Sequence, residues 1–117
     1  MSDSSGDGRS GTPPQRVADE TTLDEFLAGH DEAMVMLYTS GCAICASMEP
    51  VVSNVARETG VPVVLVNPRD DPSLIERFDV RSVPKFVLFV DGAAVAELAD
   101  GFVPGDDLAA WLESSLS

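Results

Sequence analysis

The sequence has almost no lysine. Lys85 is the only lysine among seven basic residues, which stand against 20 acidic residues and leave a formal net charge of -13. A surface this acidic repels nucleic acid and anionic lipid, so we expect neither nucleic acid nor a membrane as a partner. The excess of acids over lysine also favours a salt-adapted, halophilic source, because screening at high salt weakens repulsion among like charges.

Long apolar runs are missing as well. No stretch approaches the roughly 18 consecutive apolar residues of a membrane-spanning helix, and the first residues, MSDSSGDGRSG, contain no apolar segment of a secretory signal. We therefore expect a soluble, cytoplasmic protein. Residues 1–16 are rich in Ser, Gly and Asp and are expected to form a disordered acidic tail, whereas residues 17–117 should form one folded domain.

Cysteine and histidine are scarce. The chain has two cysteines, Cys42 and Cys45, and one histidine, His30. Tetrahedral zinc needs four ligands, so one chain cannot complete a structural zinc site, although a site shared across a dimer would escape this count. A disulfide between residues so close in sequence removes little entropy from the unfolded chain. We expect no metal, an ordinary surface position for His30, and a redox function for the cysteine pair.

The apolar pattern predicts an α/β fold. A first helix is expected in TTLDEFLAGH, residues 21–30, where Thr22 and Glu25 have the spacing of a capping box. Near-continuous apolar runs at 33–39 and 61–67 predict strands buried on both faces, and residues 71–78 begin as a helix should. Residues 85–98 predict a hairpin that turns at Asp91-Gly92. A last helix should begin near 104–107, with an apolar face formed by Leu108, Trp111, Leu112 and Leu116. This order predicts a central mixed sheet flanked by helices.

The two cysteines fall where the strand at 33–39 gives way to a helix. Cys45, Met48, Val52 and Val55 repeat at helical spacing, so Cys45 should face inward, with Cys42 at the helix N-terminus. Unpaired N–H groups and the macrodipole stabilise a thiolate at that position. Cys42 is therefore the expected nucleophile, and Cys45 the thiol that resolves a mixed disulfide.

Several ordered motifs resemble the thioredoxin family over nearly all of residues 17–117. They are the CxxC after a strand, Pro50 five residues after the second cysteine, the segment VRSVPKFVLFVDG, and Gly101 before the last helix. The resemblance implies a thioredoxin fold that ends in a β-hairpin and a C-terminal helix. It also implies a monomer with no cofactor beyond the redox-active disulfide, disulfide-bearing client proteins, and a thioredoxin-reductase-like electron donor.

The same resemblance implies a docking surface for clients. It places a cis peptide bond between Val83 and Pro84, with the backbone of this segment against the dithiol. Around Cys42 it implies a flat, weakly apolar patch, which we call the docking patch, formed by Gly41, Ala43, Ile44, Val83, Pro84 and Gly101.

The chain also departs from the family pattern. The usual Trp-Cys-Gly-Pro-Cys is replaced by Gly41-Cys42-Ala43-Ile44-Cys45, and the family's buried acid and lysine align with Met36 and Leu65. The expected function is thiol–disulfide oxidoreductase activity that reduces protein disulfides. The departures leave open a thioredoxin-fold adaptor or redox sensor with little general reductase activity. A glutaredoxin-like, glutathione-dependent function is less favoured, because the CxxC contains no aromatic residue.

Overall fold

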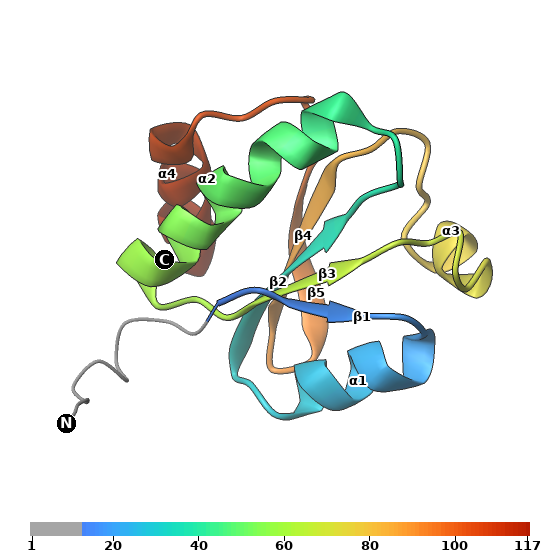
Figure 1. Ribbon diagram of the computed structural model, residues 1–117. Helices are drawn as coiled ribbons and strands as arrows, with labels where there is room; N and C mark the ends of the chain where they lie inside the picture. The colour runs from blue at the N-terminus through green and yellow to red at the C-terminus, as the bar shows by residue number, and fades with distance from the viewer. Residues whose placement is uncertain (1–12) are drawn as a thin grey trace, which may run out of the picture.

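The computed structural model describes residues 13–117, which form a single mixed sheet with helices on both faces (Figure 1). The strand order is β1-β3-β2-β4-β5. Strands β1, β3 and β2 are parallel, whereas β4 is antiparallel to β2, and β5 to β4. The strands are β1 (Gln15–Val17), β2 (Glu32–Leu37), β3 (Val63–Val66), β4 (Lys85–Val90) and β5 (Ala93–Leu98). The predicted mixed α/β sheet is confirmed.

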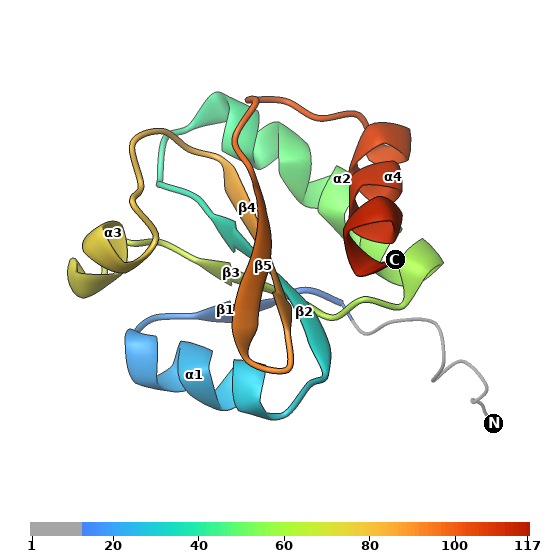
Figure 2. The same cartoon turned by 180° about the vertical axis from the view of Figure 1, so that it is seen from behind.

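Four helices cover the sheet, two on each face (Figures 1 and 2). Residues of α2 and α4 share one apolar cluster with the sheet, and residues of α1 and α3 share a second cluster on the opposite face. The helices are α1 (Glu20–Ala28), α2 (Ala43–Thr59), α3 (Ser73–Arg77) and α4 (Gly105–Leu116). The dithiol lies at the N-terminus of α2 and therefore belongs to the α2–α4 side.

The central strand β2 is buried on both faces, as its apolar run predicts. Met34 and Met36 face the α2–α4 cluster, whereas Val35 and Leu37 face the α1–α3 cluster. This alternation follows from the period of two in a strand. It fixes the register of β2, because a shift by one residue would exchange the two faces.

The predicted hairpin is also confirmed. It turns at Asp91 and Gly92, which have φ angles of 52° and 81°, and joins β4 to the edge strand β5. Both angles lie in the left-handed region, which Gly adopts freely and which Asp tolerates better than most residues. The last helix is confirmed too, with Leu108 and Leu112 buried on its inner face.

The edge strand β1 was not predicted, and it shows that the folded domain begins before residue 17. Residues 15 and 16 were assigned to the tail, but Gln15 and Arg16 pair with Val64 and Leu65 of β3. The sheet thus takes in two residues before position 17. The remainder of the expected tail, residues 1–12, lies outside the described residues.

The predicted start of α1 is wrong. The capping residue is Asp19, whose side chain accepts a hydrogen bond from the Thr22 backbone N–H at 2.8 Å. That bond, with the other hydrogen bonds to its carboxylate, holds the pKa of Asp19 below its usual value. Asp19 and Thr22 are both good capping residue types, so spacing alone favoured the wrong one.

His30 follows α1, on the face of the sheet opposite the dithiol. Its Nδ1 lies 2.8 Å from the Phe26 carbonyl oxygen, and its ring centroid lies 4.5 Å from that of Phe26. Within residues 13–117 no helix is both long and apolar enough to cross a membrane.

Candidate active site

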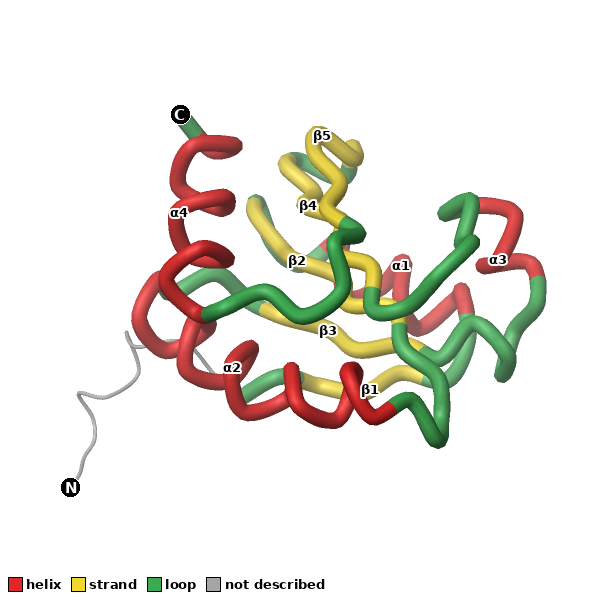
Figure 3. Tube along the Cα trace, turned by 90° about the horizontal axis from the view of Figure 1, so that it is seen from above, coloured by secondary structure: helices red, strands yellow, loops and turns green. Residues whose placement is uncertain are grey.

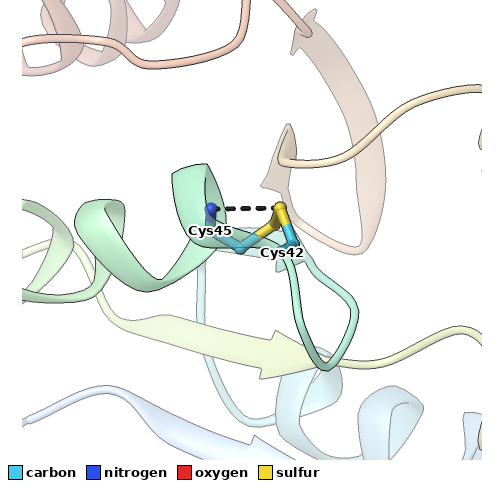
Figure 4. Close-up of a disulfide and its surroundings, with 2 residues drawn as sticks. All are labelled: Cys42 and Cys45. Carbon is cyan, nitrogen blue, oxygen red and sulfur yellow. Dashed lines mark hydrogen bonds between the residues drawn. A yellow bond between two sulfur atoms is a disulfide. The ribbon is translucent and has the colours of Figure 1, made fainter.

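Cys42 and Cys45 form a disulfide at the N-terminus of α2 (Figure 4). Their Cα atoms are 5.2 Å apart, within the usual range for a disulfide. One residue is the helix cap and the other lies in the first turn, so the helix itself brings the two sulfur atoms together. In the reduced protein this geometry keeps the Cys45 thiol within reach of a mixed disulfide at Cys42.

Cys42 caps α2 through its sulfur. The Cys45 backbone N–H donates to Cys42 Sγ at 3.1 Å, which is the bond drawn dashed in Figure 4. The Cys42 backbone adopts the extended conformation typical of a cap, and its carbonyl oxygen accepts from the Ala46 N–H at 3.0 Å. A reduced sulfur in this position faces free helix N–H groups and the positive end of the macrodipole, which favours the thiolate.

A tight turn delivers the chain from β2 to Cys42. The Cys42 N–H donates to the Thr39 carbonyl oxygen at 3.4 Å, and Gly41 between them has a φ of 80°. A side chain at position 41 would meet no atom within 4 Å, so the backbone angle, and not space, requires glycine. Gly41 therefore sets the direction in which Cys42 enters the helix.

The two sulfurs differ in exposure. Cys45 is 2% exposed and belongs to the apolar cluster with Met36 and Met48, whereas Cys42 is half-buried at its border. Cys42 is therefore the more accessible of the two sulfurs. This asymmetry agrees with the helical spacing of the sequence.

The floor beneath the dithiol is apolar. Met36 pairs with Leu65 across β2 and β3, and with Phe86 across β2 and β4. All three side chains are buried in the cluster that contains Cys45. Within residues 13–117 the buried polar or charged side chains are Asn67 and Lys85, so no buried acid lies under the cysteines.

The docking-patch residues come from the start of α2, where Ala43 and Ile44 lie, and from the segments after β2, before β4 and after β5, which lie at one end of the sheet (Figure 3). Val83 and Pro84 are joined by a cis peptide bond directly before β4, whose first residue Lys85 pairs with Leu37 at the end of β2. Gly101 follows β5, which is paired with β4 at that same end. The structure thus places these segments at the end of the sheet where β2 leads to Cys42.

Exposure differs across the docking patch. Gly41, Ala43 and Ile44 are exposed, with Ile44 at 46%, while Pro84 is buried and Val83 and Gly101 are half-buried. Phe102, which the sequence analysis did not single out, follows Gly101 and is 49% exposed. A lone aromatic in a loop gives no periodic signal that would distinguish it from a core residue.

The Gly101 loop is tied to α2 by a sulfur. The Val103 N–H donates to Met48 Sδ at 3.3 Å in the buried core. Met48 lies one turn after Cys45 on the same helix face, so this contact fixes the loop relative to the dithiol. Helical spacing predicted that Met48 is buried, but not this hydrogen bond.

Arg16 is a further residue that sequence reasoning missed. Its guanidinium pairs with Glu49 on α2 and lies 5.0 Å from the centre of the Tyr38 ring. The hydrogen bond that Arg16 donates to Glu49, together with its hydrogen bond to Tyr38, raises the pKa of Arg16 above its usual value. The Glu49 carboxylate, the acid nearest to Cys45 in sequence, is thus held by Arg16.

A capping cysteine at a helix N-terminus with a buried partner cysteine one turn on is the arrangement of dithiol–disulfide oxidoreductases. Within residues 13–117 no group of three or more potential metal ligands gathers anywhere in the fold.

Comparisons with known proteins place the chain within this class. The family model described as Thioredoxin matches residues 15–114. Thioredoxin 1 of Synechococcus elongatus is 32% identical over 102 residues, covering 86% of this chain and 94% of the relative. A thioredoxin of Synechocystis is 29% identical over 109 residues, covering 92% of this chain and 99% of the relative.

A solved structure gives the same result. An asparagine-to-glutamine mutant thioredoxin from Halobacterium salinarum NRC-1 superimposes with a TM-score of 0.82 at 31% identity, covering 92% of this chain and 96% of the other. The chain belongs to the thioredoxin family and has the thioredoxin fold. It is a thiol–disulfide oxidoreductase that reduces protein disulfides through its CxxC cysteine pair.

Proposed function

We propose that Cys42 is the attacking nucleophile and Cys45 the resolving thiol. The Cys42 thiolate attacks one sulfur of a client disulfide, a bond forms between Cys42 and that sulfur, and the other client sulfur leaves as a thiolate. Cys45 then loses its proton and attacks Cys42 Sγ, and the second client sulfur leaves. Two electrons pass from the dithiol to the client, and the protein is left with the Cys42–Cys45 disulfide.

The difference in exposure between the two sulfurs carries this assignment. Cys45 is 2% exposed, whereas Cys42 is half-buried and is the sulfur that accepts a helix N–H. An incoming disulfide must align in line with the attacking sulfur, which is possible at the border of the protein and not in its core. Helix N–H groups around Cys42 also favour its thiolate, the reactive form.

The docking patch is the proposed client surface. An extended client segment would lie along the backbone of Val83 beside Pro84 and cover the exposed side chains of Ala43 and Ile44. Backbone hydrogen bonds to such a segment are independent of client sequence. Phe102 adds an apolar side chain on the Gly101 side of the patch. Its exposed ring would supply apolar contact area for the client and so compensate in part for the tryptophan that Gly41 replaces.

A thioredoxin-reductase-like donor is the proposed source of electrons. It would dock at the same patch and return two electrons to the Cys42–Cys45 disulfide. We also propose that the protein acts as a monomer in the cytoplasm of a salt-adapted organism. The acidic composition, with 20 acids and one lysine, supports the salt adaptation.

Reduction of insulin disulfides driven by dithiothreitol tests the reductase function. Wild type should accelerate the precipitation of the insulin B chain, and Cys42→Ser should abolish the acceleration. Ile44→Ser, in the docking patch, should slow turnover while leaving the reaction with dithiothreitol intact. Wild type that oxidises and reduces normally but leaves insulin unreduced would favour an adaptor or redox sensor.

A further inference from the structure

A basic hollow adjoins the dithiol at the end of the sheet. Among its lining residues are Thr39 after β2, Arg69 after β3, Ile75 of α3, and Val80, Arg81 and Val83 before β4; its volume is about 230 Å³. We call it the arginine cleft. Parallel β2 and β3 end at this edge of the sheet, and the antiparallel β4 begins there, as the trace in Figure 3 shows. The segments after β2 and β3, helix α3 and the segment before β4 together line the cleft.

The arginine cleft continues directly from the docking patch. Thr39 accepts the backbone hydrogen bond of Cys42, and Val83 belongs to the cis peptide bond with Pro84. Val83 also packs against the same apolar cluster as Cys42. A client segment that lies on Val83 therefore has one side toward the sulfur and the other toward the arginine cleft.

Hydrogen-bonded turns carry the arginines of the cleft. Buried Asn67 accepts a hydrogen bond from the Arg69 N–H through its side-chain oxygen at 2.9 Å. On the other wall, the Val80 N–H donates to the Ile75 carbonyl oxygen at 2.9 Å, which closes the end of α3. These bonds fix the backbone turns that carry Arg69 and Arg81, while both side chains are exposed and free to meet a ligand.

Arg69 and Arg81 are the charges of the cleft available to a ligand. Within residues 13–117, ion pairs occupy Arg16, Arg77, Arg81 and Lys85, and none involves Arg69. The partner of Arg81 is Asp79 at 3.1 Å, and these two side chains are 84% and 71% exposed. An ion pair this exposed is weak and can be exchanged for another carboxylate.

Charge is otherwise strongly negative on this protein, at -13 overall. Lys85 is buried, and Arg16 and Arg77 are held by carboxylates of neighbouring elements. Two of the remaining basic side chains nevertheless line one cleft beside the dithiol. The overall charge would favour basic clients, whereas this cleft would favour an acidic side chain close to the reacting cysteine.

We propose that the arginine cleft binds an acidic side chain of the client next to the disulfide under attack. This inference rests on the proposed function of Cys42. The cleft has an apolar wall, with Ile75 39% exposed beside Val80 and Val83, which suits the aliphatic stem of a glutamate better than a bare inorganic anion. Arg69 and Arg81 would engage its carboxylate. The preferred substrates are therefore disulfides with glutamate near the attacked cysteine.

Matched peptides test the proposal without an electron donor. Each peptide contains one disulfide and carries glutamate, glutamine or lysine at a single position, scanned through the residues that flank the cysteine. Prereduced protein is mixed with each peptide at about 0.15 M salt, where long-range repulsion is screened beyond roughly 8 Å. We expect one flanking position at which the glutamate peptide reacts about 3- to 10-fold faster than the lysine peptide.

Charge variants assign the preference to the cleft. Arg69→Gln and Arg81→Gln should each reduce the glutamate-to-lysine rate ratio, and Arg69→Glu should invert it. The matched control is Arg57→Gln, which removes the same charge from the last turn of α2, some 15 residues and about 22 Å along the helix from Cys42. This control should leave the ratio unchanged.

Each alternative result has a separate meaning. Equal rates for all peptides, faster reaction of the lysine peptide, or an equal loss of preference in Arg57→Gln would overturn the inference and leave the reductase function standing. Failure to reduce any peptide would instead overturn the proposed function, and the inference with it. Inversion of the glutamate-to-lysine rate ratio by Arg69→Glu is the decisive result, because an arginine with only a structural role would not produce it.

Discussion

Met36 and Leu65 are direct neighbours across β2 and β3, and both side chains are buried, at 0% and 4% exposure. By the resemblance to the thioredoxin family, these two positions correspond to its buried acid and its buried lysine. An apolar pair thus stands where the resemblance implies a charged one. Within residues 13–117 no buried carboxylate lies beneath the Cys45 sulfur.

Met36→Asp restores a carboxylate to this position. We expect the reduced variant to form the Cys42 thiolate at higher pH, because a nearby negative charge opposes ionisation of a thiol. We also expect a loss of stability on the order of 1–3 kcal/mol or more, since the carboxylate is buried among apolar side chains. Thiolate absorbance followed against pH, together with denaturant unfolding, measures both effects.

Met34→Asp is the matched control. Met34 is buried on the same face of β2 but lies two residues farther from the dithiol. Both variants should lose stability, while the thiol titration should move less in Met34→Asp. Equal thiol titrations in folded Met36→Asp and wild type would show that Met36 does not influence the reactive sulfur.

Replacing either cysteine by serine should give opposite covalent outcomes. Cys45→Ser should accumulate a mixed disulfide with the client, because the attacking thiolate remains and the resolving one is lost. Cys42→Ser should accumulate none and should lose turnover. Mass spectrometry of the adducts measures this difference, and the double serine variant serves as the blank. Adducts that accumulate in Cys42→Ser and not in Cys45→Ser would show that Cys45 is the nucleophile and Cys42 the resolving thiol.

Salt should stabilise this protein. The 20 acids repel one another in dilute buffer, and screening by molar sodium or potassium chloride relieves that repulsion. We expect Tm to rise steadily across this range. A variant with amides in place of the exposed acids Glu58, Asp100 and Glu113 should show a shallower rise. A flat or falling Tm in wild type would contradict salt adaptation.

Acid should weaken the contact between α1 and α3. The Asp71 carboxylate accepts hydrogen bonds from the Glu20 N–H at 2.9 Å and the Ser73 hydroxyl at 2.8 Å. These bonds, the one from Glu20 foremost, hold the pKa of Asp71 below its usual value. A lowered folded-state pKa gives stability that is present above the unfolded pKa of about 3.9 and is lost as pH falls through the folded value.

Asp71→Asn tests this pH dependence. The variant should have a lower Tm than wild type at neutral pH, and the difference should shrink as the pH falls below about 4. Glu58→Gln removes the same charge from an exposed site on α2 and serves as the control. Thermal unfolding at a series of pH values measures the effect, and a constant difference between wild type and Asp71→Asn would contradict it.

The sequence pattern predicted those parts of the fold whose own residues carry a local signal. The apolar runs of β2 and β3 and the Asp91-Gly92 turn each carry a local signal, and each appears at the expected place. Strand β1 could not be predicted in this way. It is three residues long with an exposed, exposed, intermediate burial pattern, and its pairing with β3 is wholly non-local.

The site shows the same division. Helical spacing was enough to separate the buried Cys45 from the accessible Cys42. The arginine cleft left no such trace, because Arg69 and Arg81 lie on different loops and come together only through the order of the strands. The pair of Arg16 and Glu49, 33 residues apart, was hidden for the same reason.

The single lysine is enclosed by the fold. Lys85 Nζ donates to the Phe78 carbonyl oxygen at 2.6 Å and lies 3.1 Å from Glu97 Oε1, and the residue is 7% exposed. We therefore expect amine-reactive reagents to modify this one side-chain amine slowly on the native protein. Labelling of Lys85 should become faster when the β4 end of the sheet opens, so the rate of its acylation is expected to report local unfolding beside the active site.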